Sequence, residues 1–172
     1  MNASFDVYLH REIQQIMFTT VEESKRLLEL GLSEKSADMH YARMIMNWKG
    51  EKIERKFFSP RVGAPGSKQA SYIVQNFEDY EIVPCWSFDG LVGIMPHHIV
   101  ESGSEGQKKH LYGIRMSYMS AEHKWCFSYV TPLNENTLVN VYGDTRQEAA
   151  YRMVVWLIGS GNVPEEYLNK QQ

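Results

Sequence analysis

The stretch from Leu111 to Thr131 decides the fold, and it reads LYGIRMSYMSAEHKWCFSYVT. Aromatic and aliphatic side chains alternate with small or polar ones in its first half, and the alternation returns after a short polar segment. Because successive side chains of a strand point to opposite faces, this pattern predicts two β-strands joined as a hairpin. The residues on its aromatic face are Tyr112, Ile114, Met116, Tyr118, Trp125, Phe127 and Tyr129.

A third strand and an apolar helix follow this hairpin. Residues 137–142 have strand composition, and Asp144 with Gln147 three positions later has the spacing of a capping box. The helix that this box predicts ends at Gly159, where glycine favours a left-handed cap. A helix this apolar has to cover something, and the aromatic face of the hairpin is the nearest candidate. We therefore expect the C-terminal helix to pack on one face of the sheet.

Residues 1–50 show helical spacing of their apolar residues. One stripe runs from Ser4 to Leu30, and Gly31 stands where a helix stop is expected. Ser33 is placed to cap a second helix that continues to Lys49. Two helices with so short a link lie antiparallel, so we predict a helical hairpin. Such a hairpin either packs on the sheet of an α+β domain over residues 51–172 or protrudes as an arm.

The middle of the chain is predicted to form mainly antiparallel strands. Strand composition is found over residues 51–58, 70–75, 80–88 and 91–95, and Asp89-Gly90 favours a two-residue hairpin turn between the last two. Residues 59–71 and 102–109 have the composition of loops. The predicted fold class is therefore α+β, with an N-terminal helical hairpin, a mainly antiparallel sheet and a C-terminal helix on one sheet face.

Composition and charge exclude several classes of protein. The 172 residues fit one domain, or one domain with a helical extension. The net charge of -3 gives no general attraction to phosphate backbones, which argues against nucleic-acid binding. No apolar run is long enough to span a membrane. With two cysteines and no signal-peptide pattern, we expect a cytoplasmic protein.

Patterns that would carry catalysis or bind a metal are weak. The segment from Gly63 to Lys68 lacks the residues that a phosphate-binding P-loop needs around its lysine. His97 and His98 are adjacent, so their rings point to opposite sides of an extended chain, and no zinc-ligand spacing surrounds them. Cys85 is more typical of a packed thiol than of a nucleophile. We expect no catalytic residue, metal or cofactor, and the alternative is a small-molecule- or metal-binding enzyme with a pocket near Cys85, His97 and His98.

Aromatic strand faces also stack on the bases of single-stranded nucleic acids. That platform would consist of Tyr112, Tyr118, Trp125, Phe127 and Tyr129, with Arg115 and Lys124 nearby. The chain lacks the basic and aromatic RNP pattern of RNA-recognition sheets. Packing in the core is therefore the expected role of these rings, and nucleic-acid binding is a further alternative.

The C-terminal residues resemble a known family. They are Gly143-Asp144-Thr145, Ala149-Ala150, Arg152, Gly161 and Val163-Pro164-Glu165-Glu166. Together they resemble the end of the small NinX-like proteins that phages and prophages of enteric bacteria encode. The chain departs from that family in its N-terminal helical hairpin and at Tyr151, where the family tends to have methionine. The resemblance implies an accessory protein of a mobile element in a bacterial cytoplasm, and it assigns no active-site residue.

These observations predict a non-enzymatic accessory protein that binds a host or phage macromolecule as an inhibitor or adaptor. Aromatic residues make up 12% of the chain, and tyrosine and tryptophan are favoured at protein interfaces. The candidate contact residues are Tyr41 and Trp48 on the free stripe of the helical hairpin, and Arg61 and Lys68 in the polar loop. The same stripe is a candidate homodimer contact.

Overall fold

A computed structural model describes residues 17–48, 51–56, 60–63, 79–101, 110–133 and 136–169. Over these ranges the chain forms eight strands in two antiparallel sheets, together with three α-helices and two short 3-10 helices. This confirms the predicted α+β class. The elements are α2 (Val21–Glu29), η1 (Glu34–Ser36), β1 (Met39–Trp48), β2 (Glu51–Lys56), β3 (Arg61–Val62), β4 (Asp79–Cys85), α4 (Phe88–Ile94), β5 (His98–Glu101), β6 (His110–Met119), β7 (Lys124–Val130), β8 (Thr137–Gly143), α5 (Arg146–Gly159) and η2 (Glu165–Tyr167).

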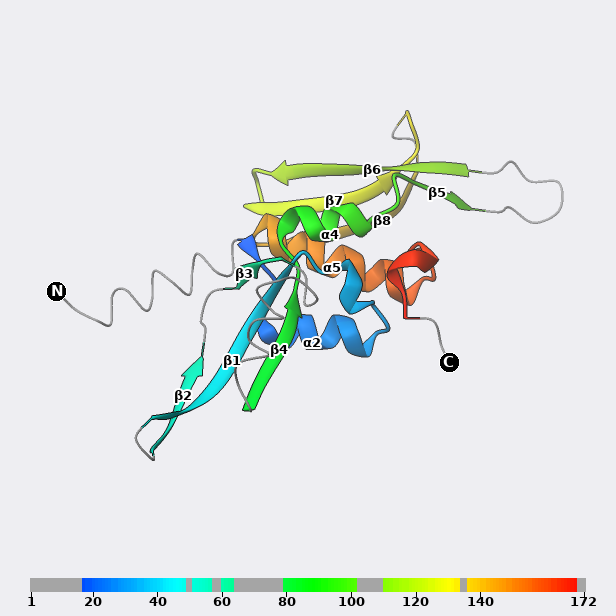
Figure 1. Ribbon diagram of the computed structural model, residues 1–172. Coiled ribbons are helices and arrows are strands. Elements are labelled where there is room, and N and C mark those ends of the chain that lie inside the picture. Colours follow the sequence, from blue (N-terminus) through cyan, green and yellow to red (C-terminus); the bar gives the residue numbers. More distant parts are fainter. Residues whose placement is uncertain are drawn as a thin grey trace.

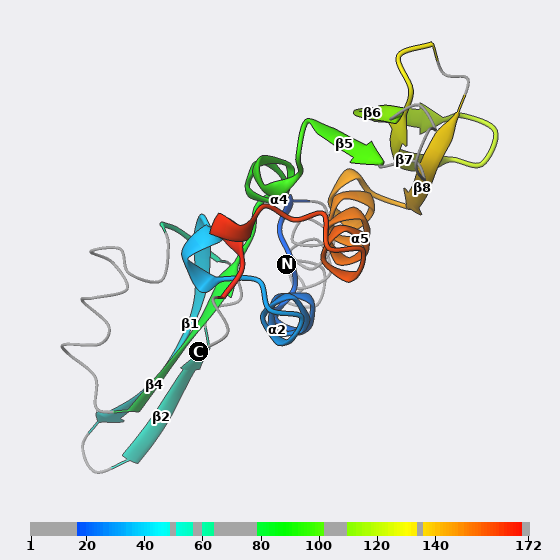
Figure 2. The same ribbon diagram turned by 90° about the vertical axis from the view of Figure 1, so that its right-hand side faces the viewer.

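The described residues are arranged in three layers. Figure 2 shows α2, α4 and α5 between a first sheet of β1 to β4 and a second sheet of β5 to β8. The first sheet extends away from the helices as an arm, which Figure 1 shows below and to the left. The main core lies among the helices and against the second sheet, and its buried residues run from Leu27 to Val163.

Strand β1 is the centre of the first sheet. β4 pairs with residues 39–45 of β1 along one edge, and β2 and β3 pair with different parts of the other edge. The prediction of a helix over residues 33–49 is therefore wrong. Met39 and Tyr41 are buried on one face of β1, and His40 and Ala42 are buried on the other. A strand buried on both faces has no alternating pattern, so its apolar residues can also fit a helical spacing.

The predicted helix from Ser4 to Leu30 is also wrong, because the chain is not helical between Phe18 and Thr20. Phe18 forms an isolated β-bridge with Ser87. Thr20 then begins α2 as its N-cap, and its hydroxyl accepts from Glu23 N at 3.1 Å while the Glu23 carboxylate accepts from Thr20 N at 2.8 Å. This reciprocal pair satisfies two backbone N–H groups and fixes the helix start. Residues 1–16 lie outside the described residues.

Gly31 ends α2 as predicted. Its φ of 97° is in the left-handed region, Leu32 N donates to Leu27 O at 3.0 Å and Gly31 N donates to Leu28 O at 2.9 Å. These two bonds are the Schellman motif. Ser33 caps the short helix η1 only, because the chain becomes extended from Ala37 onward. The described residues therefore hold no helical hairpin.

The turn predicted at Asp89-Gly90 is wrong, because both residues belong to α4. The Ser87 hydroxyl caps this helix by accepting from Gly90 N at 3.1 Å, and the Asp38 carboxylate accepts from Ser87 N at 2.9 Å. A Cβ on Gly90 would come within 2.4 Å of Asp38 Oδ1. Glycine therefore makes room for a carboxylate from a distant part of the chain. Residues 91–94 of the predicted return strand are helical in consequence, and the sequence pattern does not indicate β5.

The second sheet and its helix confirm the organising hairpin. The strand order is β5-β6-β7-β8, and α5 packs on β7 and β8. Thr145 caps α5, one position later than predicted, and its hydroxyl accepts from Glu148 N at 3.0 Å. Tyr112, Phe127 and Tyr129 are buried under the helices. The prediction of a covered face fails at the far end of β6, where two side chains remain exposed, Met116 at 43% and Tyr118 at 48%.

Trp86 joins the layers. Its main-chain N donates to Thr19 Oγ1 at 3.0 Å, and its carbonyl oxygen accepts from Thr19 N at 2.9 Å and from Gln147 Nε2 at 3.1 Å. The indole Nε1 donates to Ser36 Oγ at 3.1 Å, and the whole residue is buried. One residue at the end of β4 thus fixes the segment before α2, the first turn of α5 and η1.

Candidate functional site

The four predicted contact residues do not share a surface. Tyr41 is 8% exposed on β1, and its hydroxyl donates to Thr19 O at 2.8 Å. Arg61 lies on the two-residue strand β3 and is exposed. Trp48 is the last residue of β1. Lys68 lies outside the described residues. The helical stripe that would have carried Tyr41 and Trp48 does not exist, because β1 is a strand.

Cys85, His97 and His98 lie apart in the fold. Cys85 is fully buried in the first sheet, where its thiol donates to Thr19 O at 3.4 Å. Burial raises the pKa of this thiol from 9.0 to about 12, so it is protonated at neutral pH. His97 and His98 are exposed where β5 begins in the second sheet. The thiol and the two imidazoles that the alternative site would combine are therefore divided between the two sheets.

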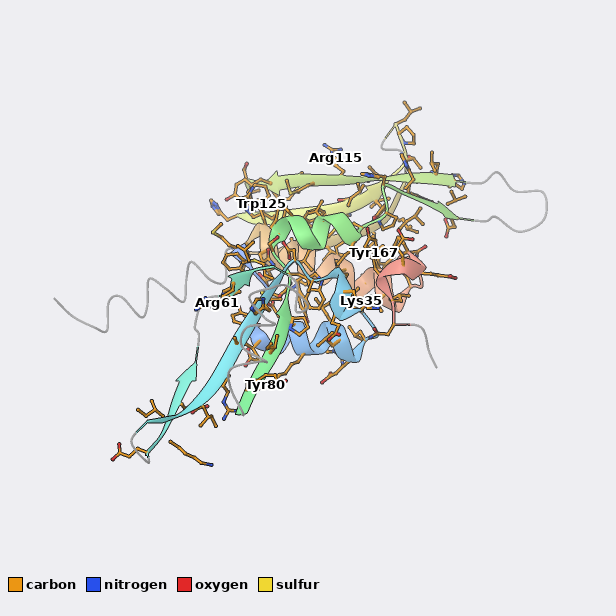
Figure 3. All side chains as sticks on the ribbon, in the orientation of Figure 1. Lys35, Arg61, Tyr80, Arg115, Trp125 and Tyr167 are labelled. Carbon is orange, nitrogen blue, oxygen red and sulfur yellow. The ribbon has the colours of Figure 1, made fainter. Side chains whose placement is uncertain are left out.

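The aromatic platform suggested for nucleic-acid binding is mostly covered. Phe127, Tyr129 and Tyr112 are each at most 6% exposed. Figure 3 shows Arg115 on the side of the second sheet away from the helices, whereas the Trp125 ring lies 5.7 Å from the guanidinium of Arg146 at the start of α5. The basic and aromatic side chains are therefore separated by the sheet, and the described residues offer no continuous face for stacking bases.

Two rings of that platform take part in a different surface, which we call the aromatic corner. The Tyr118 and Trp125 rings are 5.2 Å apart, and the Arg146 guanidinium lies 5.7 Å from the Trp125 ring and 5.2 Å from the Phe88 ring. Met116 lies beside Tyr118 on the same face of β6. The aromatic corner thus consists of Phe88, Met116, Tyr118, Trp125 and Arg146.

The aromatic corner forms where the inner face of the second sheet leaves the core. α5 packs on β7 and β8, and the face that buries Phe127 remains apolar but exposed on β6 at Met116 and Tyr118. Phe88 contacts Phe127 at 6.2 Å between ring centroids, so the corner is continuous with the core. The rigid strands and two helix starts therefore hold an exposed tyrosine, a tryptophan and a cation together.

Arg146 occupies an electrostatically unfavourable place. It is the first residue of α5, where the helix dipole favours anions over cations. The two rings that face its guanidinium offset this cost, since a cation over an aromatic face gains about 0.5–1 kcal/mol at an exposed site. The side of the Arg146 guanidinium that faces away from the two rings is therefore available for contact with a partner.

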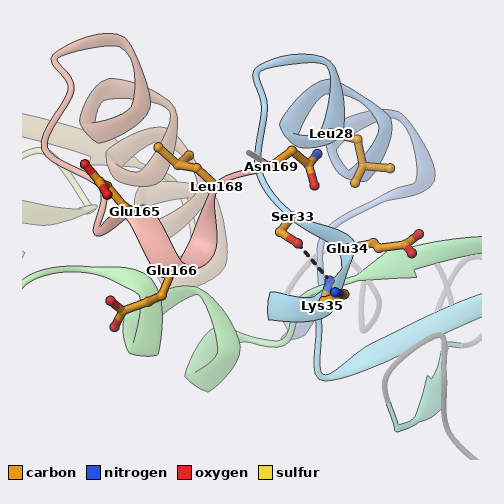
Figure 4. Close-up of a pocket in the computed structure, with 8 residues that line it drawn as sticks. All are labelled: Leu28, Ser33, Glu34, Lys35, Glu165, Glu166, Leu168 and Asn169. Atoms are coloured by element: carbon orange, nitrogen blue, oxygen red, sulfur yellow. Dashed lines mark hydrogen bonds between the residues drawn. The ribbon is translucent and has the colours of Figure 1, made fainter. Parts of the chain in front are cut away.

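A second feature is an acidic hollow of about 400 Å³ between the end of α2, η1 and η2, shown in Figure 4. Ser33 N donates to Tyr167 O at 2.8 Å and thereby ties the two walls together. A positively charged group is the ligand class that the charges of the hollow favour, since its lining includes three glutamates and one lysine. Its lining residues are Leu28, Ser33, Glu34, Lys35, Glu165, Glu166, Leu168 and Asn169.

The described residues contain neither a group of metal ligands nor a helix that could span a membrane. No three His, Cys, Asp or Glu side chains of this part of the chain are grouped as metal ligands would be. None of its helices has the length and apolar character needed to cross a bilayer. Comparisons with known proteins found no matching family model, no matching curated protein and no matching solved structure.

Sequence reasoning named Tyr118 and Trp125 but missed Phe88 and Arg146. The sequence pattern places Phe88 in a strand, although Ser87 before it is a typical N-cap residue and indicates a helix start. Arg146 stands inside the predicted helix, yet its contact with Trp125 depends on how α5 docks on the sheet. That docking is a tertiary property with no local signal in the sequence.

Proposed function

We propose that this chain is a non-enzymatic accessory protein that binds a host or phage protein through the aromatic corner. The observation that carries the proposal is the grouping of Arg146, Tyr118 and Trp125 at an exposed end of the sheet. Tryptophan, tyrosine and arginine are the residues most enriched among those that dominate binding energy at protein interfaces. The C-terminal resemblance to NinX-like proteins supports a phage or prophage origin and a bacterial cytoplasmic setting.

The physical setting of the aromatic corner also suits binding. Its rings are held by strands and by core contacts, so little side-chain entropy is lost when a partner covers them. A partner would remove exposed apolar surface at Met116 and Tyr118 and could place an acidic group against the Arg146 guanidinium. Contact alone, without a reacting group, would then be enough for this chain to inhibit the partner or to act as an adaptor for it.

Site-specific photo-crosslinking in bacterial cytoplasm tests the proposal. A photoreactive phenylalanine analogue at Tyr118 should give one discrete adduct with another protein. The same analogue at Tyr142, which is similarly exposed but lies on the other face of the sheet, should not. Arg146→Ala should reduce the Tyr118 adduct by about tenfold, in the range expected for a dominant interface residue. Arg26→Ala, an exposed arginine on α2, should leave it unchanged.

Two results would count against this function. Equal adducts from Tyr118 and Tyr142 would show that the aromatic corner is not selective. An unchanged adduct with Arg146→Ala would show that the guanidinium takes no part. An adduct of twice the chain mass is a second copy of this chain and is scored separately.

A further inference from the structure

Within the described residues, β5 occupies only half of one edge of the long strand β6. β5 pairs with residues 110–113 of β6, and its last contact is the hydrogen bond from Ile114 N to His97 O at 3.2 Å. The chain before His97 then turns away into Pro96 and α4. Figure 1 shows β5 beside only one end of β6. In the described part of the chain, no strand pairs with Met116 or Tyr118 along this edge.

The hydrogen-bonding groups on this free edge can be identified from the register. Ile114 N points toward β5, and in an antiparallel ladder the residues that face one neighbour alternate with those that face the other. The main-chain N–H and C=O groups of Met116 and Tyr118 therefore point to the free edge. Those of Arg115, Ser117 and Met119 point to β7, with which these residues pair.

We propose that the free edge of β6 pairs with the same edge of a second copy of this chain, giving a two-fold symmetric dimer. An antiparallel copy centred on Ser117 places Met116 opposite Tyr118 of the other copy, and Tyr118 opposite Met116. Each of these two pairs exchanges two main-chain hydrogen bonds. The edge-facing groups of Met116 and Tyr118 are thus satisfied by the equivalent groups of an identical strand.

The side chains fit the same register. On the inner face, the exposed Met116 and Tyr118 would come together across the dimer, and thioether sulfur packs favourably against aromatic rings. On the outer face, Arg115 would lie opposite Met119, so no like charges meet. Ser117 is small and meets itself at the axis, which lets the backbones approach. Edge strands that avoid pairing commonly carry charges or proline, and neither is found at Met116, Ser117 or Tyr118.

The symmetry has a consequence for the aromatic corner. A two-fold axis perpendicular to the sheet keeps both inner faces on the same side, so the two aromatic corners would lie on one side of a continuous eight-stranded sheet. Pairing through the edge uses the main chain of β6 and the side chains of Met116 and Tyr118, and its tests measure self-association, whereas the tests of the proposed function measure an adduct with another protein and its dependence on Arg146. The two proposals can therefore fail separately.

Sedimentation equilibrium and thiol crosslinking test the dimer. The purified chain should have twice its 20.0 kDa mass at high concentration. In the proposed register the two Ser117 residues form a non-hydrogen-bonded pair, whose Cα atoms lie about 4.5 Å apart and within reach of a disulfide. Ser117→Cys should therefore oxidise to a covalent dimer. Cys126 is replaced by alanine in this variant, because it pairs with Ser117 across β6 and β7 and would compete for the thiol.

Met119→Cys in the same Cys126→Ala background is the matched control. The two copies of Met119 would lie four residues from each other along the strands, about 13 Å, which is too far for a disulfide. A monomeric mass at the highest soluble concentration would overturn the proposal. Equal crosslinking of the two variants would also overturn it, since collisions and not register would then explain the covalent dimer.

Ser117→Lys gives a second, independent readout. It would place two lysines side by side at the axis and raise the dissociation constant of the dimer by about tenfold or more, since directly opposed like charges are destabilising. Asn140→Lys, at an exposed position of the outer face on β8, should leave the dimer intact. Circular dichroism confirms that both variants fold. Equal dissociation constants for the two folded variants would contradict the assigned register.

Discussion

Replacing Gly143 by alanine should loosen α5 from the second sheet. Gly143 ends β8 opposite Trp125, and the first turn of α5 lies directly against it. A Cβ at this position would lie 2.4 Å from Ala149 N and 2.9 Å from Ala149 Cα. Ordinary contact begins at 3.4 Å, so Ala149 N would have to retreat by about 1 Å. The obstructing atoms are helix backbone and cannot rotate away.

The expected cost is about 3 kcal/mol, near the upper end of the range for overpacking, because a whole helix has to move. For a chain of this length, that loss lowers the melting temperature by about 6–12 °C. Thermal unfolding followed by circular dichroism measures the shift, and urea unfolding gives the free energy of unfolding independently.

Gly159→Ala is the matched control for this prediction. Gly159 is the last residue of α5 and a Cβ there meets nothing within 4 Å. Alanine should stabilise the helix by about 0.5–1 kcal/mol, since it loses less conformational entropy on folding than glycine does. The reasoning is refuted if Gly143→Ala melts within about 2 °C of the unaltered protein, a shift worth less than about 1 kcal/mol at this chain length.

Three further predictions concern the cap, a buried thiol and an ion cluster. Thr145→Ala should lower the free energy of unfolding by about 1 kcal/mol, and Asp144→Ala by less than half of that, because Thr145 is the N-cap of α5. If urea unfolding ranked the two variants in the reverse order, this assignment of the cap would be wrong. The pKa of the Cys85 thiol is raised to about 12 in the folded chain, so the unfolded chain loses this proton first and the contribution of the thiol to stability, present below pH 9, declines above it. Relative to Cys85→Ala, the free energy of unfolding of the unaltered protein should fall by about 1.4 kcal/mol between pH 7 and pH 10. Parallel plots of unfolding free energy against pH for the two proteins would contradict this. Lys25 and Arg43 hold the pKa of Glu81 below its ordinary value, so Glu81 contributes stability above that pH and loses it as the pH falls through the folded pKa. Glu81→Gln should lower the free energy of unfolding by at most about 0.5 kcal/mol at pH 7, because both ion pairs are exposed. In acid the two proteins should have the same free energy of unfolding.

The late hairpin could be predicted because its pattern is local. In residues 111–131 large apolar side chains alternate with small or polar ones at a period of two. The second face of β7 is also buried, but its Cys126 and Ser128 are small or polar, so the alternation remains visible in the sequence. β1 could not be predicted in this way. It is buried on both faces around His40, so its alternation disappears and the spacing of its apolar residues also fits a helix.

The error at Asp89-Gly90 has a different cause. The dipeptide is a strong turn signal, but Gly90 is glycine because the Asp38 carboxylate, far away in sequence, occupies the space beside it. The aromatic corner likewise contains residues that a local sequence pattern indicates and residues that only tertiary packing brings into place. The alternating pattern indicates Trp125 as part of an aromatic strand, whereas Arg146 contacts Trp125 only when α5 packs against Gly143. Contacts made by tertiary packing leave no periodicity to detect.

The layer of helices between the sheets has a consequence for how the molecule melts. The first sheet has a small core of its own, made of Met39, Tyr41, Val83 and Cys85, whose cover comes partly from Val21 at the start of α2. Because the opposite side of α2 belongs to the larger core, neither sheet can lose its order without exposing apolar surface on the other. A calorimeter should therefore record one cooperative endotherm, and no fragment limited to a single sheet should survive as a folded half.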